Sequence, residues 1–488
     1  MYSNHVAEVF GACPISARTR INGMLRATIL AAAAVLCAAT LAAGQTVTTI
    51  YNFTGLSNSG ANPWYVTLVQ GTNGNLYGTS YNGGVGGFGT IFSVSTSGSE
   101  KVVYSFKGGT KDGANPTGGL TLGSDGSFYG TTQQGGTQSM GTIFKLSTTG
   151  AVSILHNFNT FVDGAFPWGA PILASDGNLY GTTSGGGENG RGIVYKMTTS
   201  GTFTTIYKFD VTNTHGFGPI APPTQGTDGN LYIPVDQGGT FYCGTILKMS
   251  TAGVLSGTYD FPCGAGGSFP IGPLVQASNG NFYSTTQDGG SNGEGVIYQV
   301  TPGLGVTVLH SFGATFGDGT FPGAGLLLAT DGNYYGSTSD GGASGDGTLF
   351  NTSTSGTYAS LYSFNNTSNF TQTSPLSPPV QATNGTLYGV TEFGGTSNDG
   401  TVYSLTLGLS PFVNAPLFSG KEGNIVTLLG THLTGTTKVT FNGIAANFRV
   451  LSATHMIAAV PAGATTGPIE VSTPHAVLQG RKNFVVRR

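Results

Sequence analysis

The sequence predicts an all-β fold, namely a seven-bladed β-propeller closed by an N-terminal strand and followed by a small Ig-like β-sandwich. Three observations predict it. A unit of 51–53 residues occurs seven times, each unit contains four short strand-like runs, and no segment of the mature chain has a sustained helical period. The 82 glycines alternate with hydrophobic residues, and aromatic residues make up 11% of the chain, which argues against a disordered low-complexity protein.

The repeat is marked by the glycine of an Asn-Gly or Asp-Gly turn. Ten residues later comes the second glycine of a pair, and five residues after that another glycine opens a run such as GTIFKLS. Only the connector before the next marker varies in length. The marker glycines are Gly74, Gly126, Gly177, Gly229, Gly280, Gly332 and Gly385.

Each repeat contains four apolar runs separated by turn signals. In the second repeat these runs are GGLTLGS, FYGTT, GTIFKLS and VSILHNF. An Asn-Gly or Asp-Gly pair between two such runs is a strong hairpin signal, because both turn residues must tolerate positive φ. We therefore expect one antiparallel four-stranded sheet for each repeat.

The two ends of the repeat region predict a closed ring. The seventh repeat has a third strand from Gly400 but no fourth, while an unassigned strand, Val47–Phe53, precedes the first marker. A ring needs one strand to join its first and last blades, which also removes an exposed sheet edge. A stacked β-helix is the alternative architecture.

Residues 1–44 have the pattern of an export signal. Three arginines precede the apolar run Ile29–Leu41, and small residues up to Gly44 offer a cleavage site, with translation starting at Met1 or Met24. The apolar run is about 15 residues, short of the roughly 20 that a membrane span needs. We therefore expect a secreted or cell-surface protein, with the periplasm as an alternative, and no transmembrane segment after cleavage.

The charge and the cysteines indicate which partners and which redox environment to expect. The formal net charge is −3 and only 8% of residues are charged, so there is no basic footprint for nucleic acid. Cys243 and Cys263 remain after cleavage and flank one predicted hairpin, which favours a disulfide over two separate thiols. The expected partner is an extracellular glycan or surface protein, and we expect a monomer.

From residue 409 to 488 the repeat stops, and short apolar-polar alternations are broken by Gly, Pro and Asn, as in a small β-sandwich. This segment resembles the IPT/TIG immunoglobulin-like family, which implies a spacer or interaction module without catalytic residues. The matching residues are Gly430, Leu433, Val439, Phe441, Asn442, Gly443, Phe448, Val450, Val460, Pro461, Gly467, Val471, Phe484 and Val486.

The repeats themselves resemble the bacterial tandem-repeat family called GloVer, through DGNLYGTT, the glycine pair, GTIF and LYSF over residues 46–407. The resemblance implies an exported, propeller-like protein without an established activity. The expected domains are thus a signal peptide at 1–44, a propeller at 45–408 and an IPT/TIG domain at 409–488.

In a propeller, the glycine-pair loops and the connectors emerge on one face, here called the loop face. It holds 11 of the 21 acidic residues, so it would attract cations or cationic ligands. Five repeats have an amide or carboxylate just before the glycine pair, which could bind a sugar or Ca²⁺, or simply cap the loop and face water. These residues are Asn82, Gln134, Gln237, Asp288 and Asp340.

Two aromatic residues are further ligand-binding candidates. Trp64 and Trp168 are the only tryptophans, and each follows a proline at nearly the same point of its connector. They could stack on a sugar ring or wedge between neighbouring blades.

Neither calcium binding by the turn residues nor catalysis is supported by the sequence. Asp occupies the turn in four repeats, but Asn replaces it in three, which fits a turn role better than calcium binding. No nucleophile with a base, carboxylate pair or transition-metal spacing stands out, so no catalytic residue is predicted. Metal ligands stay unassigned, and no cofactor is predicted, with Ca²⁺ as the one that the loop residues would allow.

The predicted function is binding of an extracellular ligand, a glycan or surface partner, on the loop face. A polysaccharide-active lyase or glycosidase with its site in the propeller channel is one alternative, and a purely structural surface component is the other.

Overall fold

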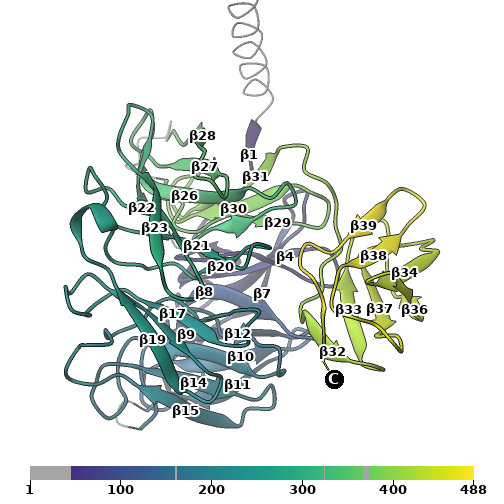
Figure 1. The fold of residues 1–488 in the computed structure, drawn as a ribbon, viewed down its shortest axis with the longest axis horizontal. Helices are drawn as coiled ribbons and strands as arrows, with labels where there is room; N and C mark the ends of the chain where they lie inside the picture. Colours follow the sequence, from purple (N-terminus) through teal and green to yellow (C-terminus); the bar gives the residue numbers. More distant parts are fainter. Residues whose placement is uncertain (1–45, 160–161, 324, 366–372, 488) are drawn as a thin grey trace, which may run out of the picture. The chain divides into compact units, whose positions relative to one another are not determined.

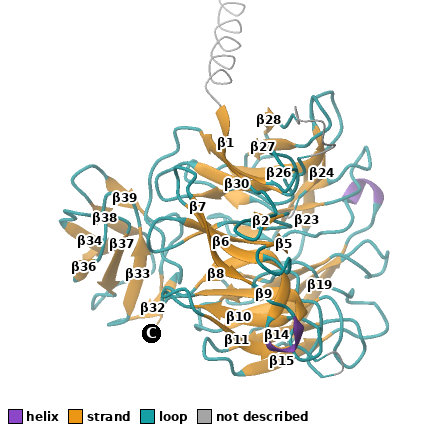
Figure 2. Cartoon of the chain, turned by 180° about the vertical axis from the view of Figure 1, so that it is seen from behind, coloured by secondary structure: helices purple, strands orange, loops and turns teal. Residues whose placement is uncertain are grey.

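The computed structural model describes residues 46–487 apart from 160–161, 324 and 366–372. The predicted export signal and its cleavage site lie outside these residues. The described chain is almost entirely β-structure, with 3-10 turns η1 (Gly109–Lys111) and η2 (Gly264–Gly266) as its helical elements (Figures 1 and 2). No helix in this part of the chain is both long and apolar enough to cross a membrane.

The repeat region forms antiparallel sheets with the predicted four strands, except that the sheet of the sixth repeat has five. Within the first six sheets the strand order follows the chain. The first three consist of β3 (Val69–Gln70), β4 (Leu76–Ser80), β6 (Thr90–Val94) and β7 (Glu100–Ser105); β8 (Gly113–Leu122), β9 (Phe128–Gly135), β10 (Thr142–Leu146) and β11 (Val152–Asn157); and β12 (Ile172–Leu173), β13 (Leu179–Thr183), β14 (Ile193–Met197) and β15 (Phe203–Lys208).

The next three sheets repeat this order. They consist of β16 (Thr224–Gln225), β17 (Leu231–Val235), β18 (Thr245–Met249) and β19 (Leu255–Asp260); β20 (Val275–Gln276), β21 (Phe282–Thr286), β22 (Val296–Val300) and β23 (Val306–Ser311); and β24 (Gly319–Pro322), β25 (Leu327–Leu328), β26 (Tyr334–Gly341), β27 (Thr348–Thr352) and β28 (Tyr358–Ser363). A separate two-stranded ladder joins β2 (Gly60–Ala61) to β5 (Asn82–Gly83).

The sheet of the last repeat takes its outer strand from the other end of the repeat region. Its order is β1 (Thr46–Asn52), β31 (Thr401–Thr406), β30 (Leu387–Thr391) and β29 (Val380–Gln381), and Figure 1 shows β1 beside β31. Just beyond β1, the Phe53 amide donates a hydrogen bond to the Gly400 carbonyl at 3.0 Å. Buried Phe53 shares one hydrophobic cluster with Leu76 and Phe92 of the first repeat and Val402 of the last.

The glycine and the two threonines of the YGTT motif in the second strand each have a packing role. A Cβ on Gly130 would come within 2.5 Å of the Phe144 ring on the third strand, so glycine leaves room for that ring. The first hydroxyl reaches the connector of the next repeat, where Thr131 donates to the Gly169 carbonyl at 3.2 Å. The second hydroxyl pairs inside its own sheet, with Thr132 and Thr142 oxygens 2.8 Å apart. Most repeats keep this motif because their sheets share the same packing, whereas the fourth repeat has Ile233, Pro234 and Val235 at these positions.

The last eighty residues form three small sheets around one core that includes Leu428, Phe441, Met456 and Phe484. The strands are β32 (Ser419–Lys421) with β40 (Val485–Arg487); β33 (Ile425–Leu429), β37 (His455–Ala459) and β36 (Phe448–Val450); and β35 (Ile444–Ala445), β34 (Lys438–Phe441), β38 (Ile469–Ser472) and β39 (Val477–Gln479).

Three hydroxyl groups of this C-terminal segment bind equivalent turns of the first three repeats. Thr454 donates to the Thr72 carbonyl at 2.9 Å and Thr427 to the Ser124 carbonyl at 2.9 Å. Ser419 donates to the Ser175 carbonyl, also at 2.9 Å. Each accepting residue directly precedes the Asn or Asp of its turn, so the repeat offers the same acceptor at 51–52-residue intervals.

Candidate functional site

The glycine-pair loops place the five predicted polar residues at the ends of the second strands or just beyond them. Asn82, Gln134 and Gln237 are exposed, and Asp288 and Asp340 are half-buried. Their backbones pair with the connector of their own repeat, for example Gln134 with Ala114 and Asp288 with Ser268.

The side-chain contacts of these residues are mostly local. The Asn82 amide donates to Asn62 Oδ1 at 3.1 Å, and the Gln237 amide donates to Asp236 Oδ2 at 3.3 Å. The Ser339 hydroxyl lies 2.5 Å from Asp340 Oδ2. These bonds fit loop capping, so a shared ring of the five side chains stays a prediction.

The position one residue earlier connects the first two repeats, and it was not among the predicted ligand-binding positions. The Tyr81 hydroxyl donates to Gln133 Oε1 of the next repeat at 3.2 Å. In the other repeats this position holds Ser184, Asp236, Gln287, Ser339 and Glu392. Alternation of side chains along an extended strand turns adjacent residues to opposite sides. The signal was available, because this residue directly follows the two buried positions of the YGTT motif.

The two tryptophans come together although 104 positions separate Trp64 from Trp168 in the sequence. Their ring centroids are 5.0 Å apart with an interplanar angle of 61°. Tyr81 packs edge-on against Trp64 at 5.1 Å, and Tyr65 lies 6.4 Å from Trp168. The Trp168 indole N–H donates to Ser184 Oγ at 3.1 Å, which orients the ring. All four rings are half-buried and form what we call the aromatic cluster.

A small cavity adjoins the aromatic cluster. Its volume is about 70 Å³, enough for one or two water-sized groups. Tyr65 has φ of 53°, a left-handed conformation that disfavours a bulky side chain and often marks functional positions. Six different repeats contribute to the cavity wall, through Tyr65, Gly118, Trp168, Ile220, Ile271 and Ser377.

Two carboxyl groups from different repeats act on the same tyrosine. Burial raises the pKa of Asp236 to about 6 and that of Glu392 to about 7. Burial raises the pKa of Tyr65 first, and the charges of Glu392 and Asp236 raise it further. The Asn62 amide donates to the Glu392 carbonyl at 3.3 Å, which ties Glu392 to the Trp64 connector.

Asp236 has an unsatisfied oxygen. The residue is 7% exposed, and its Oδ2 accepts the hydrogen bond from Gln237. Its Oδ1 is buried without a hydrogen-bond partner among the described residues. A buried acceptor without a donor is unfavourable by about 1–3 kcal/mol, so such a group is a candidate for contact with a ligand.

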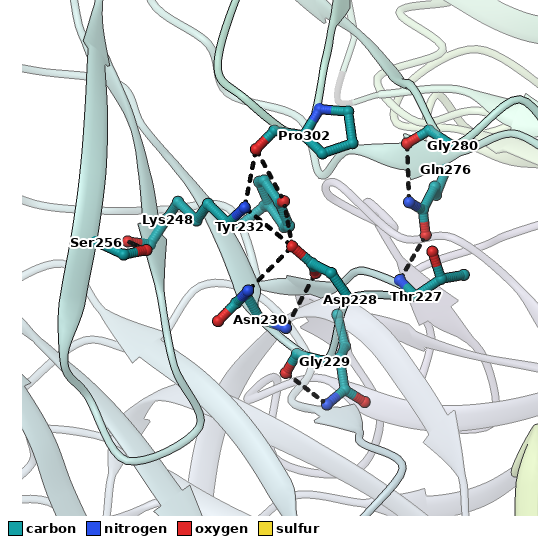
Figure 3. A network of polar contacts seen from close by, with 11 residues as sticks. Thr227, Asp228, Gly229, Asn230, Tyr232, Lys248, Ser256, Gln276, Gly280 and Pro302 are labelled. Atoms are coloured by element: carbon teal, nitrogen blue, oxygen red, sulfur yellow. Dashed lines mark hydrogen bonds and ion pairs between the residues drawn. The ribbon is translucent and has the colours of Figure 1, made fainter.

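The turn aspartates serve the fold, as expected. Asp228 Oδ1 accepts the Asn230 backbone N–H at 3.1 Å, and its Oδ2 accepts from Asn230, Tyr232 and Lys248 at 2.8–2.9 Å (Figure 3). Asn279 replaces the aspartate in another repeat and still caps the turn, accepting the Asn281 N–H at 2.9 Å. In the described part of the chain, no cluster of three His, Cys, Asp or Glu side chains could hold a metal ion.

The predicted disulfide is confirmed. Cys243 and Cys263 are bonded, with Cα atoms 5.5 Å apart across the open end of the β18–β19 hairpin. The bond ties the glycine-pair loop of the fourth repeat to the connector that follows it. Asp236 lies in the same repeat, seven residues before Cys243.

Repeated antiparallel sheets that line one cavity from several repeats define a propeller-like repeat protein, and the fold of one solved structure supports this class. A streptogramin B lyase matches with a TM-score of 0.51 at 14% identity, over 74% of this chain and 97% of that chain, which shows a likeness of fold. A periplasmic gluconolactonase of Pseudomonas aeruginosa matches at 0.43 and 14%, over 69% and 97%. An auxiliary nutrient binding protein of Bacteroides thetaiotaomicron matches at 0.36 and 15%, over 61% and 74%.

The chain belongs to the Gloeobacter/Verrucomicrobia repeat family, whose model matches residues 21–226 and 219–447. This confirms the resemblance drawn from the repeats, and the match extends beyond them into the C-terminal segment. A comparison with curated proteins found no significant match.

Proposed function

We propose that the chain is an exported seven-bladed propeller that binds an extracellular glycan at the aromatic cluster on its loop face. Each repeat sheet is one blade, and β1 supplies the outer strand of the last blade. The position of β1 beside β31 and the cluster shared by Phe53, Phe92 and Val402 support ring closure. The confirmed disulfide supports an oxidising, extracellular setting.

The C-terminal segment is proposed to be an IPT/TIG-type, Ig-like domain. Short antiparallel sheets around one core support this assignment, and Phe441 and Phe484, two residues of the resemblance, pack edge-on at 5.1 Å. Its hydroxyl contacts with the repeat turns suit a module that is fixed to the propeller.

The observation that carries the binding proposal is the convergence of Trp64 and Trp168 beside a cavity that Trp168 and Tyr65 help to line. Aromatic rings provide an apolar face for a sugar ring, while carboxylate and hydroxyl groups accept its hydrogen bonds. The indole N–H of Trp168 is already bonded, so the ring can keep its orientation when a ligand binds.

Glycan-array screening followed by titration of the wild-type protein tests the proposal. Trp168→Ala should lower affinity for the selected glycan at least tenfold, because it removes the tryptophan ring that belongs to the cluster and also lines the cavity. Phe316→Ala is the control, since Phe316 is an exposed aromatic residue (92%) that is not one of the four rings of the cluster. Failure of every glycan and cell-wall fraction to bind would contradict the proposal and favour a purely structural surface role.

A polysaccharide-active enzyme is the second candidate, and the raised pKa values of Asp236 and Glu392 favour it. A carboxylic acid that keeps its proton near neutral pH can serve as a general acid, and two carboxyl groups are needed in most glycosidases. Release of reducing ends or of unsaturated sugars from a bound polysaccharide, lost in Glu392→Gln, would identify this activity. Binding without turnover would exclude it for that polysaccharide.

A further inference from the structure

The cavity beside the aromatic cluster has a mostly apolar wall. Its apolar side chains come from three connectors and belong to Trp168, Ile220, Pro222, Ile271 and Pro273. The rest of the described wall consists of glycines and residues with a hydroxyl group, and no acidic or basic residue belongs to it. A charged substituent would lose its hydration there without gaining a partner. The wall therefore favours a neutral group with an apolar part.

The size of the cavity limits what can enter it. Its volume of about 70 Å³ holds one or two groups the size of a water molecule and is too small for a sugar ring. Trp168, Ile220 and Pro222 are half-buried, so the wall is in part open to solvent and a group can enter from outside. A short substituent of a sugar fits this space, while the ring itself has to stay outside.

Hydrogen bonds from the repeat sheets fix the backbone of the wall. The Thr131 hydroxyl donates to the Gly169 carbonyl at 3.2 Å, and the Ser284 hydroxyl donates to the Pro273 carbonyl at 2.9 Å. The Ser337 hydroxyl donates in the same way to the Ser377 carbonyl at 3.0 Å. All three accepting residues line the cavity. A wall that is already held in place selects ligands by size, because it does not have to be ordered when a ligand binds.

The aromatic cluster and the cavity share two residues. Tyr65 and Trp168 belong to the cluster, with ring centroids 6.4 Å apart, and both also line the cavity. A sugar ring that packs on the cluster therefore has the cavity directly beside it. The substituent that points from the ring toward the cavity decides whether this space is filled.

We propose that the ligand is a glycan of N-acetylated amino sugars and that the cavity binds the acetyl group. The methyl group packs against the apolar wall near Ile220 and Pro222, and the sugar ring packs on the aromatic cluster. The carbonyl oxygen of the acetyl group is a hydrogen-bond acceptor, and Tyr65, Thr67 and Ser377 provide the wall with hydroxyl groups. This inference rests on the proposed glycan-binding function and deepens it by naming the sugar class.

Titration calorimetry with the full chain tests the inference on three oligomers of equal length, made of glucosamine, N-acetylglucosamine and N-butyrylglucosamine. The N-acetyl oligomer should bind at least tenfold more tightly than the free amine, because only the acetylated sugar fills the cavity. It should also bind at least tenfold more tightly than the N-butyryl oligomer, because the longer chain exceeds the space. The strongest ligands on the glycan array should likewise contain N-acetylated sugars.

A cavity variant locates the effect. Ile220→Ala enlarges the cavity and should improve binding of the N-butyryl oligomer relative to the N-acetyl oligomer about tenfold, as expected for burial of the extra methylene groups. Ile444→Ala is the matched control, because it is the same substitution at a position that is 43% exposed in the C-terminal segment. Ile220→Phe fills the cavity and should abolish the preference for the N-acetyl oligomer over the free amine. Near-ultraviolet circular dichroism checks the folding of each variant.

The outcomes separate this inference from the function on which it rests. Equal binding of the free amine and the N-acetyl oligomer, with loss in Trp168→Ala, would overturn the acetyl proposal but keep glycan binding. The same conclusion would follow if none of the three oligomers bound while array glycans without acetyl groups did. An unchanged order of the oligomers in Ile220→Ala and Ile220→Phe would show that the cavity does not hold the acetyl group. Absence of binding by the oligomers and by every array glycan would overturn both proposals.

Discussion

Replacing Asp236 by asparagine should raise the free energy of unfolding above that of the wild type, and this gain should be larger at pH 8 than at pH 4. Asp236 is almost fully buried, and burial raises its pKa from the usual 3.8 to about 6. At about 1.4 kcal/mol per pH unit, this difference corresponds to at most about 3 kcal/mol of unfolding free energy. Asparagine has nearly the same shape but no charge to desolvate.

The direction follows from proton binding. Between pH 4 and pH 6 the folded protein keeps the Asp236 proton, whereas the unfolded chain has released it. The contribution of this residue to stability is therefore greatest at low pH, falls as the pH rises toward 6 and is constant above that value. The gain from Asp236→Asn should be under about 1 kcal/mol at pH 4 and approach about 3 kcal/mol at pH 8.

Urea unfolding followed by tryptophan fluorescence measures the effect, since both tryptophans lie in the aromatic cluster. Asp228→Asn is the control with the opposite sign. Burial raises the pKa of Asp228, but hydrogen bonds from Asn230, Lys248 and Tyr232 outweigh it and lower the pKa to about 2. The stability that Asp228 provides is present above its unfolded pKa, so Asp228→Asn should destabilise the protein at pH 8. An Asp236→Asn effect that is the same at both pH values would refute the reasoning.

Three further predictions concern the framework of the site. Phe53→Ala should destabilise the protein by about 3–5 kcal/mol, because the Phe53 ring is fully buried against Phe92. Val85→Ala, at an exposed site, is the control and should change stability little. Equal melting temperatures for both variants would contradict closure by the N-terminal strand. The double variant Cys243→Ser, Cys263→Ser should lose up to about 3 kcal/mol of unfolding free energy, as expected for a loop of this length. A reductant should lower the melting temperature of the wild type to that of the double variant and leave the double variant unaffected. Thr427→Ala should lower the free energy of unfolding by about 1 kcal/mol and speed proteolysis near residue 409, because it removes the hydrogen bond to Ser124. Thr431→Ala is the control, because the Thr431 hydroxyl contacts its neighbour His432. Unchanged cleavage of Thr427→Ala would show that the Thr427 hydroxyl does not hold the C-terminal segment.

The repeat pattern was sufficient to predict the sheets and the disulfide. The glycine at Gly130 and the hydroxyls at Thr131 and Thr132 recur in most repeats, because those repeats share the same local packing and therefore show a periodic pattern in the sequence. Cys243 and Cys263 could be paired for the same reason, since a hairpin with known strand positions places its two ends together.

The site was only partly predictable. Trp64 and Trp168 were identified as candidates, but their mutual contact could not be derived because their connectors belong to different repeats. In the fourth repeat, the residue just before the glycine pair, Gln237, was the predicted ligand-binding residue. The buried carboxyl group belongs to the residue before it, Asp236. A strand reverses the direction of its side chains at every residue, so a small error in position selects the wrong side.

The amino-acid sequence by itself determined the repeat, its strands and turns, the hairpin disulfide and the acidic character of the loops, because these depend on interactions within a repeat or between adjacent ones. Only the tertiary structure decided which side chains from distant repeats share one cavity and which carboxyl groups lose their water. Both depend on how the sheets are arranged in space, and desolvation in particular is a property of everything that surrounds a group rather than of its neighbours in the chain.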